Sequence, residues 1–103
     1  MKKKSTPELI AGEKLILRLY VSGMSPKSME AIENIKHLCD EHLKDTFELE
    51  IIDIYKNPEL AVEQHIVFSP SLIKHLPLPK RTLIGTLSDT EKVIKALGIG
   101  FKK

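Results

Sequence analysis

The sequence predicts a single α/β domain built around a mixed β-sheet, and three observations carry this prediction. Short apolar runs rich in strand-forming residues occupy positions 15–21 and 47–54. Between them, positions 26–43 carry apolar residues at spacings of three and four, which is typical of an amphipathic helix. Beyond position 66, two further strand candidates precede one amphipathic segment, so we expect a hairpin and a closing helix.

The first strand and the first helix both have clear end signals. The run Leu15–Val21 stops at Ser22-Gly23, as a buried strand does. Ser25 is a suitable helix cap, and Pro26 suits the first helical position because its missing N–H would have no partner there. We expect the helix to turn these residues inward: Met29, Ile32, Ile35, Leu38 and Cys39.

The second strand is expected at Phe47–Ile54, beside the first strand through a right-handed crossover. Asn57-Pro58 ends it and opens a short helix over Glu59–Gln64. The next strand-like run, Val67–Ile73, contains Pro70. Because proline removes a ladder donor, this run must be an edge, a bulge or a cis turn.

The C-terminal part is expected to contain a connection, a strand and a helix. Leu76–Lys80 is too rich in proline for regular structure, and Arg81–Leu87 is a strand candidate. Ser88 and Glu91 have the spacing of a capping box, and Gly98 would stop the helix that follows. The order β-α-β-α-β-β-α, with parallel strands first and a hairpin last, matches a thioredoxin-like fold, which by itself says nothing about activity.

Composition limits the function classes. The chain has 103 residues, and we expect a flexible basic tail at 1–13 and one domain at 14–103. Sixteen basic and 14 acidic residues give a net charge of +2, which does not favour nucleic acid or a membrane surface as partner. No apolar stretch is long enough to span a membrane. The single cysteine allows no internal disulfide, so a reducing, cytoplasmic location is expected.

The motifs for catalysis are missing from the sequence. A thioredoxin-like enzyme carries its reactive thiol between the first strand and the first helix, and this loop, Gly23–Ser28, holds no cysteine. Cys39 is expected to be a buried apolar residue. His37 and His42 do not share a helix face, so no metal site is predicted. No nucleotide-binding loop or nucleophile turn is present either, and we predict no cofactor and no catalytic residue.

Ser69-Pro70 stands where thioredoxin-like folds have a cis proline at the start of the third strand. In the catalytic relatives this proline faces the cysteines, and here only a role in shaping the turn would be left to Pro70. The sequence alone leaves the isomer open.

Several stretches occur together over nearly the whole chain, from about Leu15 to Leu97. They are Leu17–Gly23, Ser25–Ser28, Ile52–Leu60, Ser69–Leu72, Leu76–Pro79, Ile84-Gly85, Leu87–Asp89 and Glu91–Val93. In this order and spacing they resemble the KaiB family of clock-associated proteins. The N-terminal sensor domain of the histidine kinase SasA looks similar as well.

The resemblance implies a non-enzyme that docks on a partner. KaiB proteins bind the ring-shaped ATPase KaiC and can sequester KaiA. They switch between a tetrameric ground-state fold and a thioredoxin-like monomer, and the switch remodels the chain beyond Asn57-Pro58. We therefore expect a protein that modulates a KaiC-like ATPase in a clock, stress or signalling system. A KaiA-like or histidine-kinase partner and a homo-dimer or tetramer are compatible with this.

The chain departs from the family pattern in the last helix, where the family's Gly-Leu-Asp is Ala96-Leu97-Gly98. Alanine is favoured over glycine in a helix interior by ~1 kcal/mol, and Gly98 makes a natural stop. Both changes favour the state with a long last helix. We therefore expect the chain to rest in the thioredoxin-like fold and to switch fold little or not at all.

The expected partner interface consists of charged or titratable residues at positions where the resemblance places docking residues: Lys27, Glu30, His65, Lys80 and Arg81. Glu30 and His65 replace basic residues of the family, which would alter partner choice more than fold. Each of the five can equally be a solvated surface residue. Two other functions also stay open: a thioredoxin-like redox enzyme, and a binder of glutathione or another small ligand in a groove beside Pro70.

Overall fold

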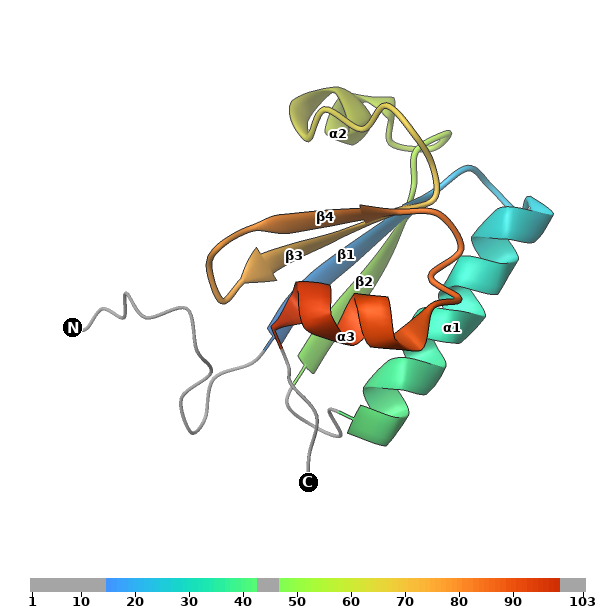
Figure 1. The fold of residues 1–103 in the computed structure, drawn as a ribbon. Coiled ribbons are helices and arrows are strands. Elements are labelled where there is room, and N and C mark those ends of the chain that lie inside the picture. The colour runs from blue at the N-terminus through green and yellow to red at the C-terminus, as the bar shows by residue number, and fades with distance from the viewer. Residues whose placement is uncertain (1–14, 43–46, 99–103) are drawn as a thin grey trace.

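A computed structural model describes residues 15–42 and 47–98 (Figure 1). The predicted tail at 1–13 lies outside the described residues. The elements are β1 (Leu15–Val21), α1 (Pro26–His42), β2 (Phe47–Asp53), α2 (Pro58–Glu63), β3 (Ser71–Leu76), β4 (Arg81–Ile84) and α3 (Thr90–Leu97). Their order is the predicted β-α-β-α-β-β-α.

The four described strands form one mixed sheet in the order β2-β1-β3-β4. Strand β1 is central and pairs in parallel with β2, with Leu19 opposite Ile51. It pairs antiparallel with β3, with Leu19 opposite Leu72. Strands β3 and β4 then form the expected antiparallel hairpin. The predicted fold class, a thioredoxin-like α/β domain with a mixed sheet, is confirmed.

Side chains of β1 point alternately to the two faces of the sheet and pack into two separate hydrophobic cores. Leu15, Leu17, Leu19 and Val21 are all buried in the larger core, with apolar residues of α1 and α3. Tyr20 points to the opposite face, into a smaller core that Leu60 of α2 helps to cover. Helices α1 and α3 therefore lie on one face of the sheet, and α2 lies beyond the opposite face near one end (Figure 1).

The third and fourth strands differ from their expected bounds: β4 is shorter, and β3 begins later and extends to Leu76, which was expected in the connection. Strand β3 begins only at Ser71, because Pro70 has no N–H to give to the ladder. The residues expected in its first half, Val67 and Phe68, are 79% and 59% exposed. Strand β4 ends before Gly85, whose φ of 114° lies outside the strand region.

The inward face of α1 differs from the expectation at its start. Met29 is 39% exposed, and Ser28 is fully buried in its place. Hydrogen bonds offset the free-energy cost of burying this hydroxyl. The Ser28 Oγ accepts them from the Ser22 N–H (3.1 Å) and the Ser25 hydroxyl (2.8 Å). The Ser28 N–H in turn donates to the Ser25 Oγ at 3.3 Å, so Ser25 caps the helix as predicted.

The predicted capping box at Ser88 is wrong by one residue. Asp89 is the cap of α3, because it has an extended backbone and its carboxylate accepts a hydrogen bond from the Lys92 N–H at 3.2 Å. The Ser88 hydroxyl instead accepts a hydrogen bond from Thr86 Oγ1 at 3.5 Å. Glu91 lies in the first turn, where its charge suits the positive end of the helix dipole.

The end of α3 is held by two features. Gly98 adopts a left-handed φ of 75° and caps the helix, and Ala96 lies half-buried within the last turn. Lys74 of β3 is only 3% exposed, and its Nζ donates to the Leu97 carbonyl at 3.3 Å. Burial and the nearby charge of Arg81 lower the pKa of Lys74. A buried lysine therefore ties the C-terminus of α3 to the sheet through this hydrogen bond.

Candidate functional site

The loop between β1 and α1 occupies the place of the redox centre in thioredoxin-like enzymes, and here it is a network of hydroxyl groups. Ser22, Ser25 and Ser28 are linked through the hydrogen bonds described above. The Ser22 hydroxyl is also hydrogen-bonded to the Ser69 hydroxyl, from the loop that precedes β3. The network fixes the loop against the sheet, and none of its members is a thiol.

The loop before β3 contains a cis proline. The Ser69–Pro70 bond is cis, and Pro70 is buried behind the serine network. Ser71 closes the turn by donating its hydroxyl hydrogen to the Phe68 carbonyl. Two further cis bonds, before Pro77 and Pro79, lie in the connection between β3 and β4 and were not anticipated from the sequence.

A third loop, between β2 and α2, joins the first through a shared carboxylate. One Asp53 oxygen accepts hydrogen bonds from the Gly23 N–H (3.1 Å) and the Tyr55 N–H (2.9 Å). Gly23 has a φ of 59°, and a Cβ at this position would lie 3.3 Å from the Tyr55 ring. Glycine suits this position because its φ is left-handed, and an added Cβ would also require the exposed Tyr55 ring to shift slightly.

Large apolar side chains project from this fixed loop pair. Met24 is 78% exposed and Tyr55 is 73% exposed. Both side chains are of the types enriched at protein–protein interfaces. Neither residue is among the interface residues expected from the sequence, although both lie shortly after a strand, in loops where binding residues are common. We call Met24, Tyr55 and the adjacent exposed charges Lys27 and Glu30 the loop surface.

The five expected interface residues are all exposed, but they form two groups. Lys27 and Glu30 lie on α1, which covers the face of the larger core. His65 follows α2, near the opposite face, and has a left-handed φ of 56°. Its neighbour Gln64 accepts a hydrogen bond from the Lys80 Nζ at 3.0 Å. We call His65, Lys80 and Arg81 the basic corner.

The structure gives no sign of a reactive thiol, a metal centre or a membrane-spanning helix among the described residues. Cys39 is fully buried within α1, and burial raises the pKa of its thiol to about 12. At neutral pH this thiol is protonated and shielded from solvent. No group of three or more metal-ligating side chains occurs within residues 15–42 and 47–98. Among the described helices, none combines the length and the apolar character that a bilayer crossing requires.

The known proteins whose sequences are similar to this chain include KaiB proteins. A sequence model of the KaiB domain matches residues 18–99. The circadian clock protein KaiB3 of a Synechocystis strain is 45% identical over 86 residues, which is 84% of each chain. The circadian clock oscillator protein KaiB of a Prochlorococcus marinus strain is 42% identical over 93 residues, which is 90% of this chain and 87% of that protein.

The solved structures with similar folds include the N-terminal domain of SasA and a thioredoxin. The N-terminal domain of Synechococcus elongatus SasA has a TM-score of 0.70 at 21% identity and covers 99% of both chains. The germline thioredoxin Deadhead of Drosophila melanogaster has a TM-score of 0.68 at 18% identity and covers 85% of this chain and 82% of its own. At such identities the likeness shows the fold alone. The domain match and the identity to the named clock proteins show more: the chain belongs to the KaiB family.

Proposed function

We propose that this chain is a non-catalytic cytoplasmic docking protein that binds a KaiC-like ring ATPase and modulates it in a clock, stress or signalling system. One observation supports this above the others. The loop surface presents Met24 and Tyr55, which are 78% and 73% exposed, on loops that hydrogen bonds hold in place. Exposed apolar groups on a rigid support lose little entropy when a partner covers them.

The charges around the loop surface would decide which partner docks. Glu30 and Lys27 lie one helical turn apart at the start of α1, and both are exposed. Charges at an interface rim steer encounter and reject wrong partners. The basic corner would provide a second, positively charged contact for a ring-shaped partner, or the site for a KaiA-like or histidine-kinase partner.

The redox alternative is weaker on chemical grounds. Disulfide exchange requires a thiolate, and the chain's one cysteine is buried with a pKa of about 12. At the place of the redox loop the chain offers serine hydroxyls, which cannot exchange disulfides. A glutathione binder would need no thiolate, and a thermal-shift titration with glutathione tests it separately.

The test is a pull-down from the native host with the chain as bait. The bait is compared with Glu30→Arg on the loop surface, Arg81→Glu on the basic corner, and Lys36→Glu as a control on the exposed face of α1. We expect the parent chain and the control to recover a KaiC-like ATPase, and at least one of the two charge reversals to lose it. Which reversal fails identifies the docking surface.

Equal recovery of the ATPase by all four baits would overturn the assignment of docking to these two surfaces, because neither would then make the contact. One result would overturn the proposal itself. Recovery of an unrelated protein, or of the chain alone, would mean that the fold was inherited without the family partnership.

A further inference from the structure

Strand β4 (Arg81–Ile84) is one edge of the described sheet, and its outer side is not paired with another described strand. Exposed edge strands are templates for another chain, and proteins usually shield them with charges, proline or a covering element. Here Ile84, at the end of the strand, is 60% exposed. The β4 edge is thus an accessible edge with an apolar residue on it.

The hydrogen-bond pattern identifies the backbone groups that point outward. The Gly85 N–H donates to the Pro70 carbonyl at 2.9 Å, so this pair is of the hydrogen-bonded type. Bonded and non-bonded pairs alternate along an antiparallel ladder. Two residues back, Leu83 bonds to β3, whereas Thr82 and Ile84 belong to non-bonded pairs. The N–H and C=O groups of Thr82 and Ile84 therefore face away from β3.

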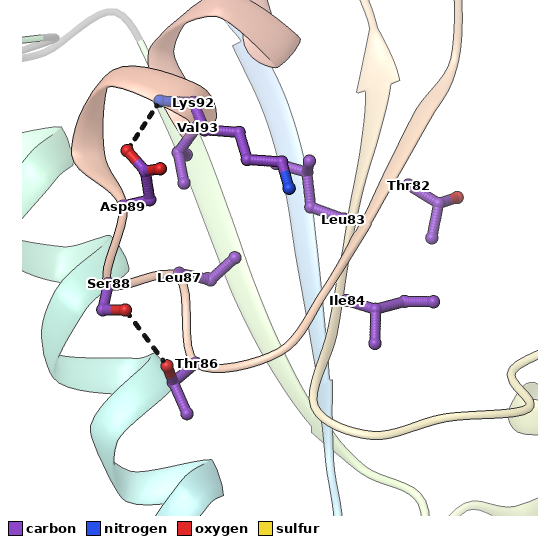
Figure 2. Close-up of a pocket in the computed structure, with 9 residues that line it drawn as sticks. All are labelled: Thr82, Leu83, Ile84, Thr86, Leu87, Ser88, Asp89, Lys92 and Val93. Carbon is purple, nitrogen blue, oxygen red and sulfur yellow. Dashed lines mark hydrogen bonds between the residues drawn. The ribbon is translucent and has the colours of Figure 1, made fainter.

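Hollows flank the strand on both faces of the sheet. On the α3 side lies a hollow of about 470 Å³, into which Leu83 points and which Leu87, Val93 and Lys92 also line (Figure 2). Thr82 and Ile84 point the other way in the same view. There, a smaller hollow of about 200 Å³ is lined by residues of the α2–β3 loop, of β3 and of β4: Gln64, His65, Ile66, Val67, Phe68, Ser71, Thr82 and Ile84.

An added strand would use both hollows in turn. Successive side chains of a strand point to opposite faces of a sheet. A peptide paired with β4 would therefore place one apolar side chain against Leu83 and the next against Ile84 and Phe68. Backbone bonds to Thr82 and Ile84 would supply affinity, and the hollows would supply specificity.

The charge at the edge favours an acidic residue in the occupant. Lys80 and Arg81 lie at the start of β4, and Lys92 lies over the α3-side hollow (Figure 2). Within the described residues, neither Arg81 nor Lys92 makes an ion pair. Strand β4 itself contains no acidic residue, so a two-fold pairing of β4 with the β4 of a second copy would bring no carboxylate from the added strand to Arg81.

We propose that the β4 edge binds an extended segment of a partner protein as an added strand, with alternating apolar side chains in the two hollows and an acidic residue beside Arg81. The proposal does not depend on docking to a ring ATPase through the loop surface. It assigns a peptide-binding function to the outer edge of β4, a site that shares His65 and Arg81 with the basic corner.

The experiment selects random peptides displayed on phage against the full chain, and the binding of each enriched peptide to the parent is then compared with its binding to Ile84→Lys. We expect enriched peptides to combine alternating apolar residues with at least one acidic residue. Thr82→Pro, which removes an outward N–H, should weaken their binding at least about tenfold, the change expected when one hydrogen bond of about 1.4 kcal/mol is lost. Val62→Lys, on the exposed face of α2, is the matched control and should bind as the parent does.

Amide hydrogen exchange measured by NMR provides a second readout. In the free chain the amides of Thr82 and Ile84 should exchange quickly, and a saturating enriched peptide should slow them at least about tenfold. If Thr82→Pro fails to fold, the Ile84→Lys comparison carries the test. Failure to enrich any peptide, or equal binding by Ile84→Lys, overturns the proposal. Concentration-dependent protection of these two amides without peptide also overturns it, because a second copy would then be the occupant.

Discussion

Restoring the family's residues at the end of α3 should destabilise the thioredoxin-like fold. Ala96→Gly places glycine in a helix interior and should cost about 1 kcal/mol. Gly98→Asp puts a side chain at a left-handed φ of 75°, which for most residues costs roughly 1–2 kcal/mol and for aspartate lies at the lower end. The new carboxylate would approach Lys74, because a Cβ at residue 98 lies 3.7 Å from the Lys74 Nζ. This attraction offsets part of the cost and leaves a net of about 0.5 kcal/mol.

The two changes together should therefore lower the free energy of unfolding by about 1.5 kcal/mol, which corresponds to a fall in Tm of roughly 6–12 °C. Thermal unfolding followed by circular dichroism measures the fall, and NMR spectra show whether a second fold becomes populated. Gly98→Asn is the matched control, because asparagine tolerates a left-handed φ and should leave Tm nearly unchanged. A double variant whose Tm stays within about 1 °C of the parent would refute the reasoning, because a loss of about 1.5 kcal/mol in the free energy of unfolding would lower Tm by more than this.

Three further predictions concern the loops and the buried titratable groups. Gly23→Ala should lower the free energy of unfolding by about 1–2 kcal/mol because of the left-handed φ, and Gly23→Asn should cost less; equal costs in urea titrations would contradict this. Burial first, then the charges of Arg18 and Lys80, lower the pKa of His75. The unfolded chain therefore binds more protons below about pH 6.5, stability should fall as the pH drops, and His75→Leu should flatten this part of the urea stability–pH curve. A His75→Leu curve parallel to that of the parent would contradict the assignment. Cys39 should resist a thiol reagent at about pH 8 until the chain is unfolded, and rapid reaction of the folded chain would contradict its burial.

The first half of the fold could be predicted well because local signals and tertiary packing agree there. The apolar run of β1 matches Leu15–Val21 in the structure, and Ser25-Pro26 marks the start of α1. The start of α3 was misplaced because Ser88 and Asp89 are adjacent and both are good caps. Only the backbone conformation of Asp89 and its bond to Lys92 distinguish them.

The features that the sequence did not reveal depend on contacts between distant segments. Burial of Lys74 depends on the Leu97 carbonyl, 23 residues further along the chain. Burial of Ser28 in place of Met29 depends on a hydrogen bond from the Ser22 N–H. The position of the Tyr55 ring beside Gly23 depends on hydrogen bonds from both residues to Asp53. Hydrophobic periodicity treats such residues one element at a time and cannot detect these pairings.

The most direct test of the docking claim is a titration of the purified chain, immobilised on a sensor, with the purified KaiC-like ring ATPase of the same organism in the presence of ATP. We predict saturable binding that a charge reversal on the docking surface, Glu30→Arg or Arg81→Glu, weakens at least about tenfold, a loss of about 1.4 kcal/mol, while the Lys36→Glu control binds as the parent does. Absence of binding by the parent chain up to about 100 µM, with the chain shown by NMR to be folded, would contradict the claim that this protein acts on such an ATPase.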